Sequence, residues 1–274
     1  FSISKEIQNN IIEWITKIAQ EIKVVGLMNT QLAVQNNQIY VLEVNPRASR
    51  TVPFVAKSRG IPIAKIAAKV MTGDFLEDIL KTITIKDPQT FNVKESVFPF
   101  NKFEGVDLVL GPEMKSTGEV MGIDSTFLSA FAKSQIACGT ILPSKGKVFI
   151  SVDDDNKKFI LAIANKLLNL DFSIVATKGT SKFLSNNNLK VETINKVKEG
   201  GPHIVDAIIA NKINLVINTT KTQGSIRDSY SIRRTALTYN IPYYTTIAGA
   251  KIAVDTIEHL KKNSLKVNSL QDLI

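Results

Sequence analysis

The first periodic segment of the chain predicts an amphipathic helix over residues 5–23. Isoleucines recur there at steps of three and four residues, which is the spacing of one helix face. Two shorter stretches, 27–35 and 39–45, are strand-like and flank the turn-forming run Asn-Asn-Gln at 36–38. Further helices are expected at 60–71 and 125–137, and the stretch 84–126 is irregular with short strand candidates.

After residue 146 the pattern changes to short apolar strands that alternate with helices. The expected strands are 147–152, 172–176, 190–194, 215–218 and 242–245, and the helices are 156–170, 181–186, 202–210, 228–239 and 248–261. This alternation predicts an α/β fold with βαβ units and a parallel sheet of about five strands. A linker at 143–146 divides the chain into two expected domains, 1–145 and 146–274.

Composition excludes disulfide-stapled and membrane-spanning classes of protein. The chain has 274 residues, 44% hydrophobic content and one cysteine, which excludes a disulfide framework and a multi-cysteine metal site. No apolar run reaches the roughly 18 residues that a membrane span needs, so we expect no membrane association and a cytoplasmic location. Phe1 is not an initiator methionine, so we expect a piece of a longer protein.

The positive charge is concentrated in the second half of the chain. The net charge is +9, with 16 basic and 14 acidic residues before position 146 and 18 and 11 after it. A basic half indicates an anionic partner. No block of five basic residues and no basic–aromatic interleaving occurs, so we expect a small phosphorylated ligand rather than nucleic acid.

Three oxygen donors can meet on the predicted hairpin. Glu43 and Asn45 are two residues apart on a strand and therefore share one face. A three-residue loop would pair Gln35 with Ile39 and place Gln31 opposite Glu43, whereas a two-residue loop would put these two side chains on opposite faces. The loop length therefore decides whether the three donors can act together.

Such a donor set suits a hard cation such as Mg²⁺. Arg47 and Arg50 follow at once, and guanidinium groups beside a cation site indicate phosphate oxygens held between them. A solvated polar strand edge is the alternative interpretation. Spacing alone leaves both open.

A second group of polar residues follows the predicted strands of the second half. Because parallel strands end at one edge of a sheet, these residues are expected to gather there. Hydroxyl groups, a glycine turn and two lysines would make a phosphate site, although turn and capping roles explain any single one of them. The residues are Ser151, Lys157, Thr177, Gly179, Thr180, Lys196, Asn218, Thr219 and Thr220.

The first half resembles the ATP-grasp domain of the carbamoyl-phosphate synthase large subunit. The resemblance is carried by GLMN at 26–29, EVNPRASRTVPF at 43–54 and LGPEMKSTGEVMG at 110–122. It implies that Gln31, Glu43 and Asn45 hold two divalent ions, Mg²⁺ or Mn²⁺, which bridge the ATP phosphates. It also implies that Arg47 and Arg50 bind the phosphoryl group in transfer.

The second half resembles the methylglyoxal-synthase-like regulatory domain of the same subunit. ATKGT at 176–180, GPHI at 201–204, INTT at 217–220 and the Arg pair at 233–234 carry this match. The resemblance implies a pocket for a nucleotide effector, UMP or IMP. Matched position by position, that pocket is lined by Ser151, Lys157, Thr177, Thr180, Lys196, Asn218, Thr219 and Thr220.

Together the two resemblances imply an ATP-dependent ligase that makes carbamoyl phosphate from bicarbonate, glutamine-derived ammonia and two ATP for pyrimidine and arginine synthesis. The implied partners are the rest of the large subunit and a glutaminase small subunit. Residues 1–42 supply no glycine-rich phosphate loop, so we expect this chain alone to be inactive. The alternatives are a non-catalytic nucleotide-binding module and a methylglyoxal-synthase-like lyase, whose Gly-Gly-Asp loop is replaced here by KTQGS at 221–225.

Some members of the family also respond to ornithine. The matching positions are Glu95, Tyr243 and Thr245. The family pattern Tyr-Asp-Thr reads Tyr-Tyr-Thr here, so Tyr244 stands where the family has an acid. Loss of that carboxylate is expected to weaken the capture of a cationic amino acid.

Overall fold

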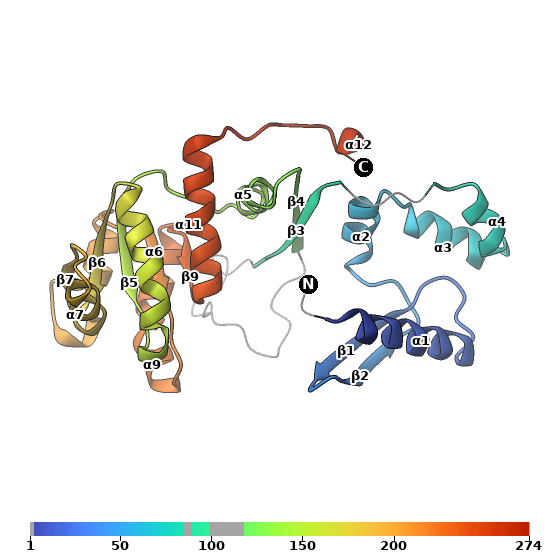
Figure 1. Cartoon of the computed structure of the whole chain (residues 1–274), viewed down its shortest axis with the longest axis horizontal. Coiled ribbons are helices and arrows are strands. Elements are labelled where there is room, and N and C mark those ends of the chain that lie inside the picture. The colour runs from blue at the N-terminus through green and yellow to red at the C-terminus, as the bar shows by residue number, and fades with distance from the viewer. Residues whose placement is uncertain (1–2, 85–88, 99–117, 274) are drawn as a thin grey trace. The chain divides into compact units, whose positions relative to one another are not determined.

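The computed structural model describes residues 3–84, 89–98 and 118–273 (Figure 1). It divides into two compact units, Phe1–Gln89 with Asn268–Ile274, and Thr90–Val267. We call them unit 1 and unit 2. The part of the LGPEMKSTGEVMG motif at 110–117 lies outside the described residues. None of the helices in the described ranges is both long and apolar enough to span a lipid bilayer.

Unit 1 combines one hairpin with helices. Helix α1 (Lys5–Glu21) matches the predicted amphipathic helix, and the hydroxyl of Ser4 caps it by accepting a hydrogen bond from the Ile7 N–H at 3.3 Å. Strands β1 (Asn29–Gln35) and β2 (Gln38–Asn45) pair antiparallel. The remaining helices are α2 (Val52–Arg59), α3 (Ile63–Met71), α4 (Leu76–Lys81) and α12 (Leu270–Leu273). Periodicity did not predict α2, because none of its residues is buried and it has no apolar face.

Unit 2 begins with a hairpin packed on a helix. Strands β3 (Phe91–Val97) and β4 (Gly118–Asp124) pair antiparallel, and both contact α5 (Phe127–Ala137). The hydroxyl of Thr126 caps α5 by accepting a hydrogen bond from the Ser129 N–H at 3.3 Å. The predicted helix at 125–137 is confirmed, with its start two residues later.

The rest of unit 2 is built on a five-stranded parallel sheet of order β7-β6-β5-β8-β9, which confirms the predicted α/β fold. The strands are β5 (Gly146–Ser151), β6 (Phe172–Thr177), β7 (Glu192–Ile194), β8 (Leu215–Asn218) and β9 (Tyr243–Tyr244). The helices are α6 (Lys157–Asn169), α7 (Lys178–Asn186), α8 (Ile204–Ile209), α9 (Gln223–Asp228), α10 (Tyr230–Thr238) and α11 (Ile247–Lys262). Short α9 was not predicted, and none of its residues is buried.

Helices cover both faces of this sheet. On β5, Val148 and Ile150 pack into one hydrophobic cluster with residues of α6, α7 and α11, whereas Phe149 packs into a second cluster with residues of α8 and α10. All three side chains are fully buried. Burial on both faces explains why the strand reads as an unbroken apolar run rather than as an alternating one.

The compact units do not divide where the sequence suggested two domains. Residues 90–145, expected with the first domain, group with the parallel sheet in unit 2. One cause is the contact between α5 and α11, where Ser129 Oγ lies 2.9 Å from His259 Nε2. The predicted boundary after residue 145 separates two domains by their family resemblance and not by their contacts, so it stays a prediction.

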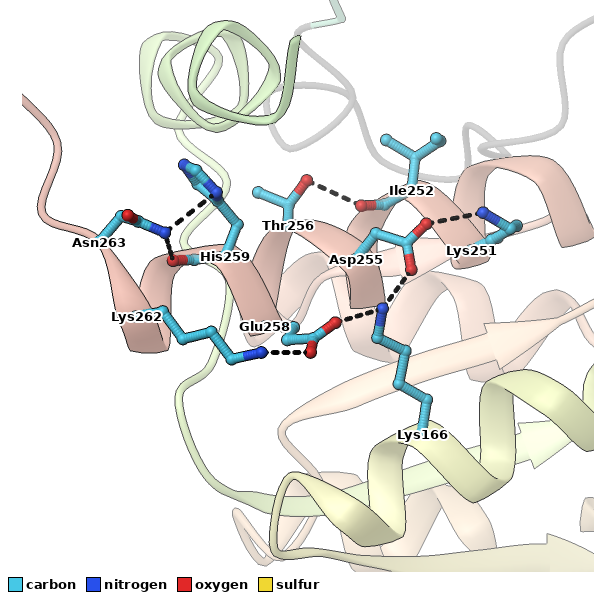
Figure 2. Close-up of polar contacts among 9 residues, drawn as sticks. All are labelled: Lys166, Lys251, Ile252, Asp255, Thr256, Glu258, His259, Lys262 and Asn263. Carbon is cyan, nitrogen blue, oxygen red and sulfur yellow. Dashed lines mark hydrogen bonds and ion pairs between the residues drawn. The ribbon is translucent and has the colours of Figure 1, made fainter. Parts of the chain in front are cut away.

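Helices α6 and α11 are joined by a network of ion pairs (Figure 2). Lys166 Nζ lies 2.7 Å from Asp255 Oδ1 and also contacts Glu258. Lys251 and Lys262 complete the network by pairing with these two acids at 2.7 and 2.6 Å. Hydrogen bonds from Lys166 and Lys262 lower the pKa of Glu258 to about 2, so its carboxylate stays charged in mild acid.

We expect Lys166→Met to lower the melting temperature by roughly 2–4 °C at pH 7, since it removes the cation shared by both acids. The pKa of Glu258 lies below its ordinary 4.5, so the stabilisation is present above that pH and is lost as pH falls toward about 2. The difference between the two proteins should therefore shrink below pH 4.5. Lys251→Met, which removes a pair within one helix, is the control, and a melting temperature unchanged by Lys166→Met at pH 7 would contradict the expectation.

Candidate functional site

The polar residues that follow the strands of the parallel sheet meet at its carboxyl edge. Ser151, Thr177 and Asn218 are the last residues of β5, β6 and β8, which are neighbouring strands. Lys157 begins α6, which follows the first of these strands after a short 3-10 helix at Asp154–Asn156. The shared edge follows from the parallel register, in which Ser151 pairs with Asn218.

Two threonines connect the strand ends. The hydroxyl of Thr177 lies 3.1 Å from that of Ser151. The hydroxyl of Thr180, in the first turn of α7, accepts a hydrogen bond from the Val152 N–H at 3.2 Å. Both threonines are almost fully buried, at 3% and 1% exposure, so their positions are fixed by the core.

Asp153 fastens the loop that follows β5. Thr219 Oγ1 donates to its carboxylate at 2.7 Å, and Asn156 Nδ2 donates to the same carboxylate at 2.6 Å. Burial raises the pKa of Asp153, but these hydrogen bonds outweigh burial and hold it below its ordinary value. The charged carboxylate of Asp153 therefore holds the loop in place through its hydrogen bonds to Thr219 and Asn156.

Asn218 carries a buried donor that the described part of the chain does not satisfy. The residue is 2% exposed, and its Nδ2 atom has no hydrogen-bond partner among the described residues. A buried amide without an acceptor is costly, so such an atom commonly faces a ligand or an ordered water. Asn218 lines a cavity of about 150 Å³, which gives that donor room for an acceptor.

All eight residues of the predicted effector pocket line this cavity or a second one of about 460 Å³. Ser151, Thr177 and Lys196 line both cavities, which therefore lie side by side. Lys157 and Thr180 line the larger cavity, and Asn218, Thr219 and Thr220 line the smaller one. The eight residues thus gather around two neighbouring cavities at this edge of the sheet, although neither cavity is lined by all of them, and their effector role stays a prediction.

Three charged residues at this site, Asp154, Asp155 and Lys221, were not predicted from the sequence. Asp154 Oδ1 lies 2.6 Å from Lys157 Nζ, and Asp155 forms an ion pair with Lys221. All four residues line the larger cavity. The acidic run at 153–155, which directly follows the first predicted strand of the second half, was a visible signal in the sequence.

The hairpin of unit 1 brings Gln31 opposite Glu43, as predicted, but for a different reason. The loop has two residues, Asn36 and Asn37, which both adopt positive φ. This is the loop length that was expected to put Gln31 and Glu43 on opposite faces. A bulge next to Gln31 shifts the register by one residue and restores the pairing.

The donor atoms on this hairpin lie close together. Asn45 Nδ2 donates to Glu43 Oε1 at 3.0 Å, which confirms that the two side chains share a face. Arg47 Nη1 donates to the Ala48 carbonyl at 2.9 Å, beyond the end of β2. In the described residues no group of three or more His, Cys, Asp and Glu could hold a metal, so a cation here would rely on the amide oxygens of Gln31 and Asn45 beside one carboxylate.

The predicted ornithine residues Glu95, Tyr243 and Thr245 line a third cavity, of about 350 Å³. The carboxylate of Glu95 accepts hydrogen bonds from Gln135 Nε2 at 2.5 Å and from Ser134 Oγ at 3.1 Å.

Tyr244 extends this chain of hydrogen bonds, since its hydroxyl donates to Gln135 Oε1 at 2.8 Å. Burial, and then the charge of Glu95, raise the pKa of Tyr244, so its hydroxyl stays neutral. The cavity therefore offers one carboxylate that already has two donors, and its ornithine assignment stays a prediction.

Two family models match the chain. Residues 2–79 match the carbamoyl-phosphate synthase L chain, ATP binding domain, and residues 159–245 match the MGS-like domain. A solved methylglyoxal synthase from Elizabethkingia anophelis covers 41% of this chain and 79% of its own, with 16% identity and a TM-score of 0.33.

Curated relatives match along the whole length of the chain. The carbamoyl phosphate synthase large chain of Myxococcus xanthus is 49% identical over 275 residues, which is 100% of this chain and 25% of the relative. That of Pseudomonas syringae pv. tomato is 51% identical over 273 residues, again 100% of this chain and 25% of the relative. The chain thus spans about a quarter of the length of these relatives. It is therefore a homologue of that quarter of the carbamoyl phosphate synthase large chain, with a segment of the ATP-binding domain followed by an MGS-like domain.

Proposed function

We propose that the carboxyl edge of the parallel sheet in unit 2 binds a nucleoside monophosphate, UMP or IMP, as a regulatory effector. The observation that carries this proposal is the buried, unsatisfied amide of Asn218, which lines one cavity with Thr177 and Lys196, while Lys157 lines the cavity beside it. A regulatory role agrees with the MGS-like domain match.

A phosphate fits the chemistry of this site. Lys157 and Lys196 supply ammonium groups, which are common phosphate binders. Gly179 lies at the start of α7, where a Cβ atom would be 3.8 Å from Lys157 Nζ, so the N–H groups of this first turn lie near that ammonium. Exposed N–H groups at a helix start favour an anion as well. The unsatisfied amide of Asn218 remains to bind an oxygen of the phosphate or of the ribose.

Thermal unfolding of the chain with UMP, IMP and inorganic phosphate tests this function. A ligand that binds only the native state raises the melting temperature, and at 100 times its dissociation constant it contributes about 2.7 kcal/mol. In a unit of this size that corresponds to a rise of roughly 5–10 °C. Equal melting temperatures with and without each of the three compounds would refute the proposal.

For unit 1 we propose that Gln31, Glu43 and Asn45 contribute to an ATP-bound Mg²⁺ or Mn²⁺ site, and that Arg47 and Arg50 bind the transferred phosphoryl group. The pairing of Gln31 with Glu43 and the contact of Asn45 with Glu43 support the donor set. A divalent ion supplies charge neutralisation to phosphoryl transfer when it is bound. The guanidinium groups would orient the phosphoryl oxygens and offset their charge.

Glu43→Gln tests the proposed metal role. The substitution removes the one carboxylate of the donor set, so we expect Mn²⁺ binding to weaken by about tenfold or more. Electron paramagnetic resonance of free Mn²⁺ measures this directly on the full chain. Glu77→Gln, on α4 of the same unit, is the matched control. Equal Mn²⁺ binding by the Glu43 and Glu77 variants would argue against the site.

We further propose that the whole protein works as an ATP-dependent ligase that forms carbamoyl phosphate from bicarbonate, glutamine-derived ammonia and ATP. The support is the full-length match of this chain to a quarter of the carbamoyl phosphate synthase large chains. Its partners would then be the remainder of the large chain and a glutaminase small subunit. In that assembly unit 1 would contribute to the ATP site and unit 2 to its regulation.

A further inference from the structure

The loop after β5 places two acidic side chains against lysines of the proposed phosphate site. Asp154 pairs with Lys157 at 2.6 Å, and Asp155 pairs with Lys221. The neighbouring Asp153 is bound instead by Thr219 and Asn156. Two of the three acids in the run therefore neutralise ammonium groups at the mouth of the cavity, and the third fixes the loop.

We propose that Asp154 and Asp155 are internal counter-ions that an incoming phosphate displaces, and that Lys221 is a third phosphate-binding ammonium group beside Lys157 and Lys196. This inference rests on the proposed effector site. Its ligand class is a phosphate monoester dianion, whose charge can replace both carboxylates. The acidic pair sets the affinity of the site, since every bound phosphate must first break these contacts.

Exposure makes the exchange feasible. The side chains of Asp154 and Asp155 are 91% and 68% exposed, so both carboxylates can return to water when they are displaced. Ion pairs between exposed side chains are weak, because water and salt screen them. A phosphate held between several ammonium groups and buried donors makes charge-assisted hydrogen bonds, which are stronger. A phosphate can therefore replace the two carboxylates beside the lysines without any rearrangement of the core.

The location of Lys221 supports its part in the site. It lies in the loop between β8 and α9, three residues after Asn218, and it lines the larger cavity together with Lys157 and Lys196. Its contact with Asp155 joins the loop after β8 to the loop after β5. Displacement of Asp155 would leave the Lys221 ammonium group facing an anion in that cavity.

The test compares binding of inorganic phosphate and UMP by calorimetry in the wild type and in Asp154→Asn/Asp155→Asn. We expect the double variant to bind both ligands between about 3-fold and about 25-fold more tightly, which is the combined scale of two exposed ion pairs. Lys221→Gln should bind more weakly than the wild type. Asp155→Asn should add nothing in the Lys221→Gln background, because the contact that it removes is already absent.

Glu192→Gln is the matched control. Glu192 pairs with Lys147 at 2.6 Å near the amino ends of β7 and β5, so the variant removes one charge and one ion pair away from the cavity. Equal affinity of the double variant and the wild type overturns the inference but leaves the effector site standing. An equal gain in Glu192→Gln also overturns it, since net charge alone would explain the result. If none of these proteins binds either ligand, the proposed function itself fails.

Discussion

Lys157→Ala should reduce the rise in melting temperature that UMP or phosphate causes in the wild type to about a third. Lys157 combines several features of a phosphate ligand: it begins α6 at the carboxyl edge of the sheet, it is 24% exposed, and it adjoins Gly179. Loss of one partner from a largely buried, charge-assisted contact costs about 2 kcal/mol or more, or roughly 30-fold in affinity. At 100 times the wild-type dissociation constant, the variant would keep only about 0.9 of the 2.7 kcal/mol that the ligand contributes, or roughly a third of the rise in melting temperature.

Thr177→Val tests a second contact at the same site without removing charge. Valine has nearly the volume of threonine, so the buried position stays filled while the hydroxyl that contacts Ser151 is lost. A weaker ligand shift is the expected result, together with a fall of a few degrees in the melting temperature of the free protein, since one buried hydrogen bond contributes about 1 kcal/mol.

Lys147→Ala is the matched control for both variants, because Lys147 lies near the amino end of β5 and pairs with Glu192. It should retain the full ligand-induced shift. A normal shift in Lys157→Ala, or the loss of the shift in Lys147→Ala, would show that phosphate binds elsewhere.

The sequence predicted the parallel sheet because its signal is local. Runs such as residues 147–152 are apolar, rich in β-branched residues and separated by helical stretches, so strand type and strand order along the chain follow from pattern alone. The strand ends then place the polar residues on one edge. Thr177, Lys196 and Asn218 could thus be grouped from the sequence, although about 20 residues separate each from the next.

The register of the hairpin in unit 1 could not be predicted from the local pattern alone. The pairing of Gln31 with Glu43 was expected only if the loop had three residues, and it is achieved through a two-residue loop and a bulge. The loop is one residue shorter than the pairing required, and the bulge adds one residue to the opposite strand, so the two changes cancel in the register. The Asn36-Asn37 pair signals the tight turn, because asparagine tolerates positive φ, but nothing in the local pattern marks the bulge.

Contacts between loops could not be predicted from the sequence. Asp155 and Lys221 are 66 residues apart, and neither lies in a periodic element from which a register could be deduced. The grouping of residues 90–145 with the parallel sheet was not predicted either, because it depends on contacts between residues far apart in the sequence. Ser129 and His259, which are in contact, are 130 residues apart. Such pairs become visible only after the strands and helices have been assembled.

Gly122→Ala should destabilise unit 2 severely, because β4 and α5 approach each other there without space for a side chain. A Cβ atom at Gly122 would lie 1.9 Å from the carbonyl oxygen of Ala130 and 2.6 Å from the backbone nitrogen of Ser134. Both obstacles are backbone atoms, so no rotamer change can relieve the clash. The strand and the helix would have to separate, and we expect a loss of about 3 kcal/mol or more in the free energy of unfolding.

Gly118→Ala in the same strand provides the matched control. Its Cβ atom would lie 3.4 Å from Val97 Cβ, close to an ordinary van der Waals contact, so a change within about 1 kcal/mol is expected. Urea unfolding followed by circular dichroism distinguishes the two variants. Similar unfolding free energies for both would mean that β4 and α5 are not packed backbone to backbone at Gly122. A selective loss in Gly122→Ala would instead explain in physical terms why the motif at 110–122 ends in glycine, since at that position the helix occupies the space of a side chain.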